Sequence, residues 1–126
     1  MHILLVEPDR ISARNYTSAF VAAGHTVAAA HTAQDAVHVA DERMPELVLV
    51  ELQLPYHNGV EFLYEFRSYT EWLHIPIIIL SFVPPSELTE ASVLTRELGV
   101  VQILHKPATS LAELCAVVDK ATTVRQ

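Results

Sequence analysis

Short and nearly uninterrupted apolar runs recur along the chain. Four of them are rich in Ile, Val and Leu, at residues 3–6, 47–50, 77–80 and 100–104. A continuous apolar run, unlike one that alternates with polar residues, is typical of a strand that is covered on both faces of a parallel sheet. A weaker run at residues 25–30 has one valine among alanines, which favours an edge strand that needs less burial. The pattern therefore predicts five strands.

The segments between these runs have helical spacing and recognisable start and stop signals. The first helix is expected to extend to about residue 23 and the third to cover residues 59–69. Gly24 and Gly99 stand where two helices should end, and glycine readily adopts the left-handed conformation that closes a helix. The residues expected to start the helices are Asp9, Thr32 with Asp35, Asn58, Ser86 after Pro84-Pro85, and Ser110 with Glu113.

Strands that alternate with helices five times predict a parallel sheet with right-handed crossovers and helices on both faces. The predicted fold class is α/β, most economically a flavodoxin-like (βα)5 three-layer sandwich with strand order 2-1-3-4-5. The chain has 126 residues, of which 51% are hydrophobic, and this suffices for one core but leaves no room for a second. We therefore expect residues 1–126 to form a single domain.

Charge and composition narrow the classes of partner. The chain carries 15 acidic and 8 basic side chains, for a net charge of −7. A nucleic-acid surface needs clustered Lys and Arg, so none is expected. The first apolar run is too short for a signal peptide or a membrane span, which predicts a cytoplasmic protein without membrane contact. The single Cys115 excludes an internal disulfide, and its apolar neighbours indicate a buried packing residue.

In a doubly wound sheet, ligands bind beyond the carboxyl ends of the strands, at the point where the strand order reverses. Two or three carboxylates, a hydroxyl and an ammonium are expected to converge there. The first strand and helix are joined without a glycine-rich loop, which disfavours an enzyme that binds flavin or nucleotide. The residues at the strand ends are Glu7-Pro8-Asp9, Glu51, Ser81 and His105-Lys106-Pro107.

The order and spacing of these groups resemble the receiver domain of two-component response regulators, over essentially the whole chain. The resemblance implies a conformational module that is not an enzyme beyond self-phosphotransfer. In that family a sensor histidine kinase phosphorylates an aspartate, neighbouring acids hold Mg²⁺, and the output is a changed protein-binding surface. The stretches that carry the resemblance are residues 3–7, residues 45–50, Leu54-Pro55 with Asn58-Gly59, residues 75–81, and Lys106-Pro107.

The resemblance also assigns roles to individual residues. Glu51 matches the phospho-acceptor, Ser81 the switch hydroxyl, and Lys106 the lysine that contacts the phosphoryl group. Glu7 matches the first acid of the metal-binding pair. Gln53 matches the residue whose backbone carbonyl completes the metal shell.

Four positions depart from the family pattern. Glu51 stands where an aspartate is usual, and Pro8 stands where a second, metal-binding acid is usual. Phe82 occupies a position that is usually small, and Ile103 occupies that of the aromatic ring which turns inward on activation. We therefore predict an atypical receiver in which the acceptor, the metal site and the switch are all altered.

Two interpretations of the acidic pocket, Glu7, Asp9 and Glu51, remain open. In the first there is no metal: Lys106 offsets the repulsion between the two glutamates, and the longer Glu51 reaches Lys106 and Ser81. In the second, Asp9 replaces the missing acid and Mg²⁺ binds. Asp9 is also a good helix cap, and this role is favoured. The metal ligands in the second case would be Glu7, Asp9, Glu51 and the backbone carbonyl of Gln53.

The leading hypothesis is a signalling module without a cofactor that acts independently of aspartyl phosphate. Its partners would be a sensor histidine kinase or a downstream signalling protein. The face of the fourth helix, fifth strand and fifth helix is the expected contact surface and a possible homodimer interface. The alternative is a working receiver that accepts phosphate from a histidine kinase with Mg²⁺.

The seven histidines do not form a pair with the spacing of a metal-binding helix. His57 and His105 are expected near the crevice, where they could add pH sensitivity. The remaining five, at residues 2, 25, 31, 38 and 74, are expected on the surface or in loops.

Overall fold

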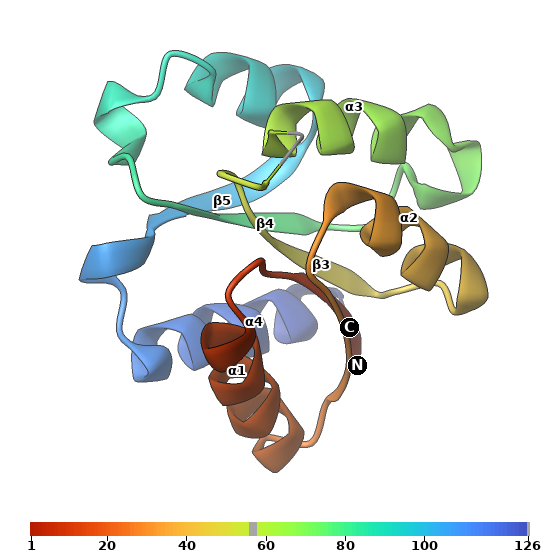
Figure 1. Ribbon diagram of the computed structural model, residues 1–126, viewed down its shortest axis with the longest axis vertical. Helices are drawn as coiled ribbons and strands as arrows, with labels where there is room; N and C mark the ends of the chain where they lie inside the picture. The colour runs from red at the N-terminus through yellow and green to blue at the C-terminus, as the bar shows by residue number, and fades with distance from the viewer. Residues whose placement is uncertain (56–57, 126) are drawn as a thin grey trace.

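The computed structural model describes residues 1–55 and 58–125, with side chains up to residue 121. Five parallel strands form one sheet in the order β2-β1-β3-β4-β5, which confirms the predicted fold class. The helices lie in two layers, with α1 and α4 on one face of the sheet and α2 and α3 on the other (Figure 1). No helix in this described part is long and apolar enough to cross a lipid bilayer. The strands are β1 His2–Val6, β2 Thr26–Ala30, β3 Leu47–Glu51, β4 Ile77–Ser81 and β5 Val100–His105, and the helices are α1 Arg10–Ala22, α2 Ala33–Glu42, α3 Gly59–Ser68 and α4 Leu111–Arg125.

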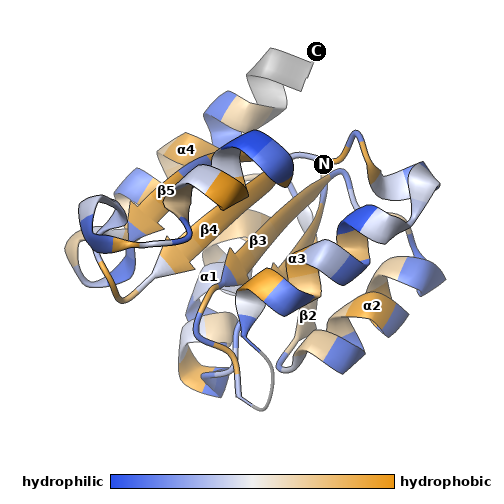
Figure 2. Cartoon of the chain, turned by 90° about the horizontal axis from the view of Figure 1, so that it is seen from above, coloured by the Kyte–Doolittle hydropathy of each residue, from blue (hydrophilic) through white to orange (hydrophobic). Residues whose placement is uncertain are grey.

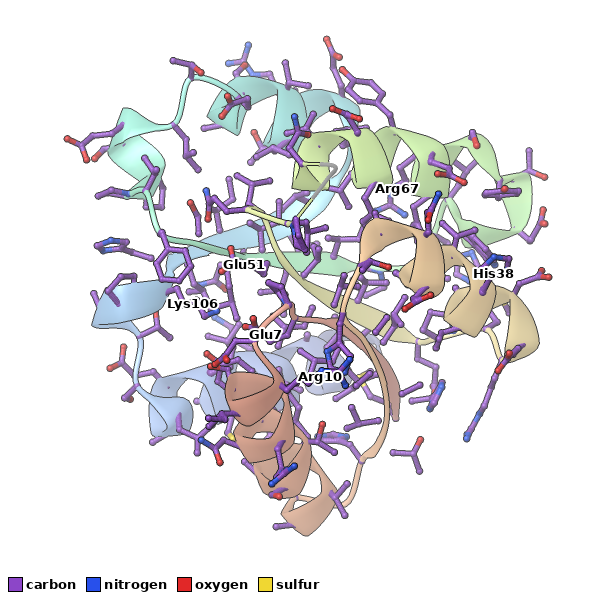
Figure 3. All side chains as sticks on the ribbon, in the orientation of Figure 1. Glu7, Arg10, His38, Glu51, Arg67 and Lys106 are labelled. Carbon is purple, nitrogen blue, oxygen red and sulfur yellow. The ribbon has the colours of Figure 1, made fainter. Side chains whose placement is uncertain are left out.

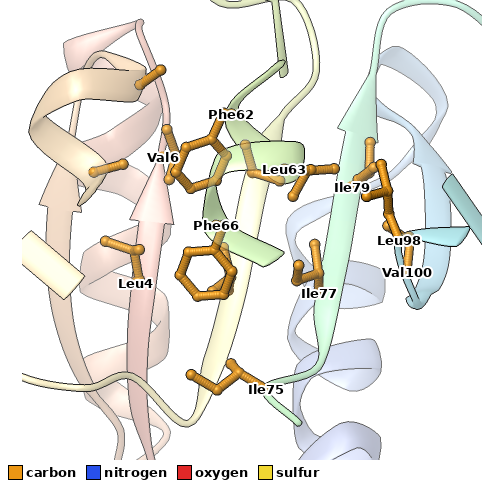
Figure 4. Close-up of a cluster of buried hydrophobic side chains, with 14 of the residues drawn as sticks. Leu4, Val6, Phe62, Leu63, Phe66, Ile75, Ile77, Ile79, Leu98 and Val100 are labelled. Carbon is orange, nitrogen blue, oxygen red and sulfur yellow. The ribbon is translucent and has the colours of Figure 1, made fainter. Parts of the chain in front are cut away.

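The central strands are buried on both sides, as their continuous apolar runs predict. Every residue of β1, β3 and β4 is buried, and Figure 2 shows β3 and β4 as hydrophobic ribbons between helices of mixed character. On one face, Phe62 and Phe66 of α3 pack over β1, β3 and β4 (Figure 4). On the other face, Phe20 of α1 and Leu114 of α4 pack over the same strands. Fully burying a side chain of this size stabilises the folded state by about 1.5 to 3 kcal/mol relative to leaving it exposed to water.

Four of the predicted helix starts are confirmed by capping hydrogen bonds. Each capping oxygen accepts a hydrogen bond from the backbone N–H three residues further on, at 2.9 to 3.1 Å. Gly24 and Gly99 have φ angles of 97° and 66°, which confirms the predicted left-handed ends. The caps are Asp9 for α1, Thr32 for α2, Asn58 for α3 and Ser110 for α4.

The prediction that the fourth helix starts at Ser86 is wrong. Residues Pro85–Glu87 form only a single 3₁₀ turn, η2. Leu88 then becomes extended and packs against the core. A regular helix from Ser86 would need helical backbone at Leu88, so the packing of this side chain overrides the start signal. A short helix resumes afterwards and ends in a π-helical turn, η3 Val93–Glu97.

Strand β5 contains a bulge that its sequence did not predict. Ile77 of β4 is the partner of Val100, whereas Ile78 is the partner of Gln102, so Val101 is an extra residue. Because of this insertion, Val100 and Ile103 both pack on the α3 side although they are three residues apart. Val101 itself is 60% exposed.

The expectation of a surface or loop position is wrong for His2, which is buried in β1, whereas His25 does lie in a loop, between α1 and β2, although its side chain is buried. His2 Nδ1 lies 2.8 Å from the Thr26 hydroxyl, and His25 Nε2 lies 3.0 Å from the Asp119 carboxylate. A buried polar ring is tolerated where it has such a partner. Burial lowers the pKa of His2. Cys115 is half-buried against the core beneath α4, where burial raises the pKa of its thiol, in line with a packing role.

The guanidinium of Arg67, at the end of α3, joins the turns that precede β4 and β5. Its Nε donates to the carbonyl of Leu98 at 2.8 Å, and Nη2 donates to that of Gly99 at 3.4 Å. Its Nη1 donates to the carbonyls of Trp72 and Leu73 at 2.7 and 3.2 Å. Burial lowers the pKa of Arg67, but a guanidinium remains charged in proteins. One side chain therefore fixes the amino ends of two neighbouring strands.

Replacing Arg67 with methionine should lower the free energy of unfolding by about 2 to 3 kcal/mol, because hydrogen bonds to a charged group are lost and carbonyls are left without donors. Urea denaturation measures this change. Arg96→Met is the matched control, since Arg96 is exposed on η3. Equal unfolding free energies for the two variants would show that Arg67 does not fix these turns.

Candidate functional site

The ammonium of Lys106 lies between two buried carboxylates at the carboxyl edge of the sheet (Figure 3). Lys106 directly follows β5, in the 3₁₀ turn η4 Lys106–Ala108. Its Nζ is 2.5 Å from Glu7 Oε1, just beyond β1, and 3.0 Å from Glu51 Oε1, at the end of β3. Both glutamates are 1% exposed. The single positive charge of Lys106 therefore forms ion pairs with two buried negative charges.

The second oxygen of each carboxylate is held by the backbone. Glu7 Oε2 accepts a hydrogen bond from the N–H of Asp9 at 3.0 Å, and Glu51 Oε2 accepts one from the N–H of Gln53 at 3.1 Å. In both cases the donor lies two residues after the acid, where the chain turns out of the strand. All four carboxylate oxygens are therefore bonded to N–H donors of the protein, as buried carboxylates require.

Burial and the shared cation shift the pKa values of this group. Burial raises the pKa of Glu51, and the negative charge of Glu7 adds to the shift, whereas Gln53 and Lys106 only partly oppose it. Burial by itself would lower the pKa of Lys106, but its bonds to the two carboxylates outweigh this and the net shift is upward. At neutral pH Lys106 is therefore charged, and the ionisation of Glu51 costs stability.

Ser81 belongs to a neighbouring hydrogen-bond network. Its hydroxyl is fully buried and accepts hydrogen bonds from the N–H of Val83 at 3.0 Å and from the side-chain amide of Gln53 at 3.3 Å. The Gln53 amide oxygen accepts a hydrogen bond from the N–H of Phe82 at 2.9 Å. The side chain of Gln53 thus joins the loops after β3 and β4. Sequence reasoning gave Gln53 only a backbone role and missed this bridge.

The ring of Phe82 covers the ammonium of Lys106, whose Nζ is 4.9 Å from the ring centroid. This is a cation–π contact, although 55% of Phe82 remains exposed. His105 Nε2 donates a hydrogen bond to the carbonyl of Phe82 at 3.1 Å, so His105 lies near the crevice, as expected. His57 lies outside the described residues. No pattern in the sequence indicated that Phe82 would sit over the lysine.

The other residues singled out from the sequence lie apart from the ammonium. The carboxylate of Asp9 is bonded to the N–H and hydroxyl of Ser12, which lowers the pKa of Asp9, and it caps α1 as favoured. Pro8 contributes no side-chain oxygen. Ile103 is half-buried and packs against the core on the α3 side. Glu51 does reach Lys106, whereas the hydroxyl of Ser81 is bonded to other groups, as described above.

The sequence pattern of the response regulator receiver domain matches residues 3–119. The chain belongs to this receiver domain family. It is 32% identical over 80 residues to the KDP operon transcriptional regulatory protein KdpE of Escherichia coli, a match that covers 64% of this chain and 34% of KdpE. It is 25% identical over 79 residues to the polar-differentiation response regulator DivK of Brucella ovis, covering 63% of this chain and 64% of DivK. The chain thus spans about a third of KdpE and less than two thirds of DivK.

Solved structures show the same fold. The Vibrio cholerae chemotaxis protein CheY4 superposes with a TM-score of 0.84 at 18% identity, covering 95% of this receiver domain and 97% of CheY4. A sensor protein from Polaromonas sp. JS666 superposes with a TM-score of 0.83 at 24% identity, covering 95% and 94% of the two chains. Its membership of the receiver domain family makes this chain a module of two-component signalling, and receiver domains are generally not enzymatic.

Replacing Lys106 with methionine should lower the free energy of unfolding at pH 7 by about 3 to 5 kcal/mol, because two buried carboxylates lose the cation that they share. The matched control is Lys120→Met, which removes the other lysine of the chain from an exposed position on α4. Urea denaturation of both variants measures the difference.

The deficit of the Lys106→Met variant should shrink as the pH falls. The pKa of Glu51 is already raised above 4.5 in the folded protein, so its ionised form opposes folding, and protonation removes this opposition as the pH falls through the folded-state pKa. In the unaltered protein, the pKa of Lys106 is raised above 10.5, so its stabilising effect is complete below that pH and is lost only as the pH rises through the raised value. A deficit that stays constant from pH 7 to pH 4 would contradict this electrostatic account.

Proposed function

We propose that this receiver domain signals through protein contacts without forming an aspartyl-type phosphate. The observation that supports this is the bridge of Lys106 between Glu7 and Glu51. To accept a phosphoryl group, a carboxylate oxygen must face the donor in line with the leaving group. Both oxygens of Glu51 are instead bonded, to Lys106 and to the N–H of Gln53, and the residue is 1% exposed. The bridge favours one fixed arrangement of the strand ends.

The residues at the strand ends do not fit Mg²⁺. This ion requires nearly octahedral oxygen ligands at about 2.0 to 2.1 Å, whereas each glutamate here has one oxygen on Lys106 and one on a backbone N–H. Pro8 has no side-chain oxygen, and the carboxylate of Asp9 is bonded to Ser12. Within residues 1–55 and 58–125, no three His, Cys, Asp or Glu side chains are grouped to hold a metal. The absence of a metal cofactor is thus part of the proposal.

The proposed partners are a sensor histidine kinase or a downstream signalling protein, in the cytoplasm. The proposed contact surface is the face formed by η3, β5 and α4, which corresponds to the fourth helix, fifth strand and fifth helix expected from the sequence. Two apolar side chains are exposed on β5 and α4, Val101 at 60% and Leu111 at 42%. The bulge in β5 is what turns Val101 out of the core. The same face is the proposed homodimer interface.

If this face mediates self-association, Val101→Glu should weaken it by at least about tenfold, since a charge would be buried without a partner at the interface. Sedimentation equilibrium of both proteins measures the monomer–dimer constant. Val21→Glu is the control, because Val21 is similarly exposed but lies on α1. A dimer that tolerates Val101→Glu, or a chain that stays monomeric at high concentration, would remove the homodimer from the proposal.

Incubation with acetyl phosphate and Mg²⁺, followed by intact mass spectrometry, tests the main proposal. The unaltered protein should show no phosphoryl adduct. The double variant Pro8→Asp with Glu51→Asp should gain one, because it supplies a shorter acceptor and a second metal-binding acid. The two single variants show which change is needed.

A stable phosphoryl adduct on Glu51 or Asp9 of the unaltered protein would establish the alternative, a working receiver that uses Mg²⁺. Circular dichroism of every variant confirms that a missing adduct does not reflect unfolding. If the double variant also shows no adduct, the two restored acids are not sufficient for phosphoryl transfer.

A further inference from the structure

One stripe of α1 gathers two arginines and two hydroxyls above a hollow. Arg10, Arg14, Thr17 and Ser18 share one side of the helix, because residues four and seven or eight apart fall on the same face. His31, just after β2, completes the polar lining. The hollow between α1 and β2 has a volume of about 290 Å³.

The hollow is open because small residues form its walls. Ala13 of α1 and Ala29 of β2 both line it, and each contributes only a methyl group. Strand β2 lies at the edge of the sheet, so no further strand covers this side. Long arginine side chains therefore surround a space that the chain itself does not fill.

The two guanidiniums above this space are available to a ligand. Neither Arg10 nor Arg14 makes an ion pair or a side-chain hydrogen bond with the residues that the structure describes. The described lining of the hollow contains no Asp or Glu, although the chain as a whole has a net charge of −7. Arg67 and Lys106, by contrast, are fully engaged with carbonyls and carboxylates.

His31 is held in a defined orientation. Its Nδ1 donates a hydrogen bond to the backbone carbonyl of Glu7 at 2.9 Å. Because a carbonyl only accepts, the proton is on Nδ1, and Nε2 is the remaining nitrogen of the ring.

We propose that this hollow binds a phosphomonoester dianion. Two guanidiniums match its two charges, and each presents a planar fork of donors suited to phosphate oxygens. The hydroxyls of Thr17 and Ser18 supply neutral donors on the same face. Small-molecule pockets usually measure about 300 to 1,000 Å³, so a hollow at the lower limit suits one phosphoryl group on a short stem better than a nucleotide.

The site is separate from the acidic crevice and does not depend on the proposed function. Figure 3 shows Arg10 on the opposite side of Glu7 from Lys106. The dianion has two possible sources, a phosphorylated side chain of a partner protein and a free small phosphate ester. Both present the same group to the two arginines.

Titration of ¹⁵N-labelled protein with O-phosphoserine, followed by NMR, tests the proposal. Saturable shifts are expected for the backbone amides of α1 and of residues 29–31, whereas serine should cause none. Arg10→Gln and Arg14→Gln should each weaken binding by about tenfold, since each removes a charge-assisted contact. Arg96→Gln is the matched control, because it removes an exposed arginine of η3 and should leave the affinity unchanged.

A short Gly-Ser peptide with one phosphoserine, titrated beside its unphosphorylated form, distinguishes the sources. Binding of the phosphopeptide at least about tenfold tighter than that of O-phosphoserine indicates a partner protein, and equal affinities indicate a small ester. The proposal is overturned if no saturable shift occurs, if Arg10→Gln and Arg14→Gln bind as well as the control, or if the shifts are confined to residues around Lys106.

Discussion

The arrangement of the strand ends depends on one ammonium shared by two buried carboxylates. Lys106 is 99 residues from Glu7 and 55 from Glu51 along the chain, so the group forms only when β1, β3 and β5 have taken their places in the sheet. Burying ions is costly unless each is paired and hydrogen-bonded, and here every carboxylate oxygen has an N–H donor. Burial is the main reason that the pKa of Glu51 is raised despite its ion pair, and the negative charge of Glu7, which leaves the group with one net negative charge, adds to the shift. All the carboxylate oxygens of the group are thus hydrogen-bonded, but its charges do not balance.

The protein shields this charge with side chains from the adjoining loops. Phe82 covers the ammonium, and Gln53 holds the backbone of Phe82 and the hydroxyl of Ser81 together. Limiting the access of water strengthens the attraction within the group, because electrostatic interactions grow as the local dielectric falls. The cover and the ion pair therefore support each other: displacing Phe82 would weaken the hold of Lys106 on Glu51, and removing Lys106 would leave Phe82 without its cation.

The sheet and the convergence of the charged residues could be predicted from the sequence, because continuous apolar runs fix the strands and parallel strands bring their carboxyl ends to one edge. The details that depend on tertiary packing could not. The fourth helix is interrupted where Leu88 packs on the core, and the bulge at Val101 adjusts β5 to the spacing of its neighbour. For neither the interrupted helix nor the bulge does the neighbouring sequence contain a residue pattern strong enough to predict it. The roles of Gln53 and Phe82 depend on side-chain directions, which no residue pattern specifies.

Glu7 connects the acidic crevice with the hollow between α1 and β2. The carbonyl of Glu7 holds the ring of His31, which lines the hollow, while the carboxylate of Glu7 holds Lys106. The two separate sites are therefore connected by the hydrogen bond between His31 and Glu7. Contact alone does not demonstrate coupling, but thermodynamic linkage makes the connection measurable in either direction. If an anion in the hollow strengthens or weakens the ion pair between Glu7 and Lys106, then removing Lys106 changes the affinity for the anion. In a receiver whose crevice is filled by its own lysine, such a surface site would give an outside signal a route to the strand ends that requires no phosphoryl transfer.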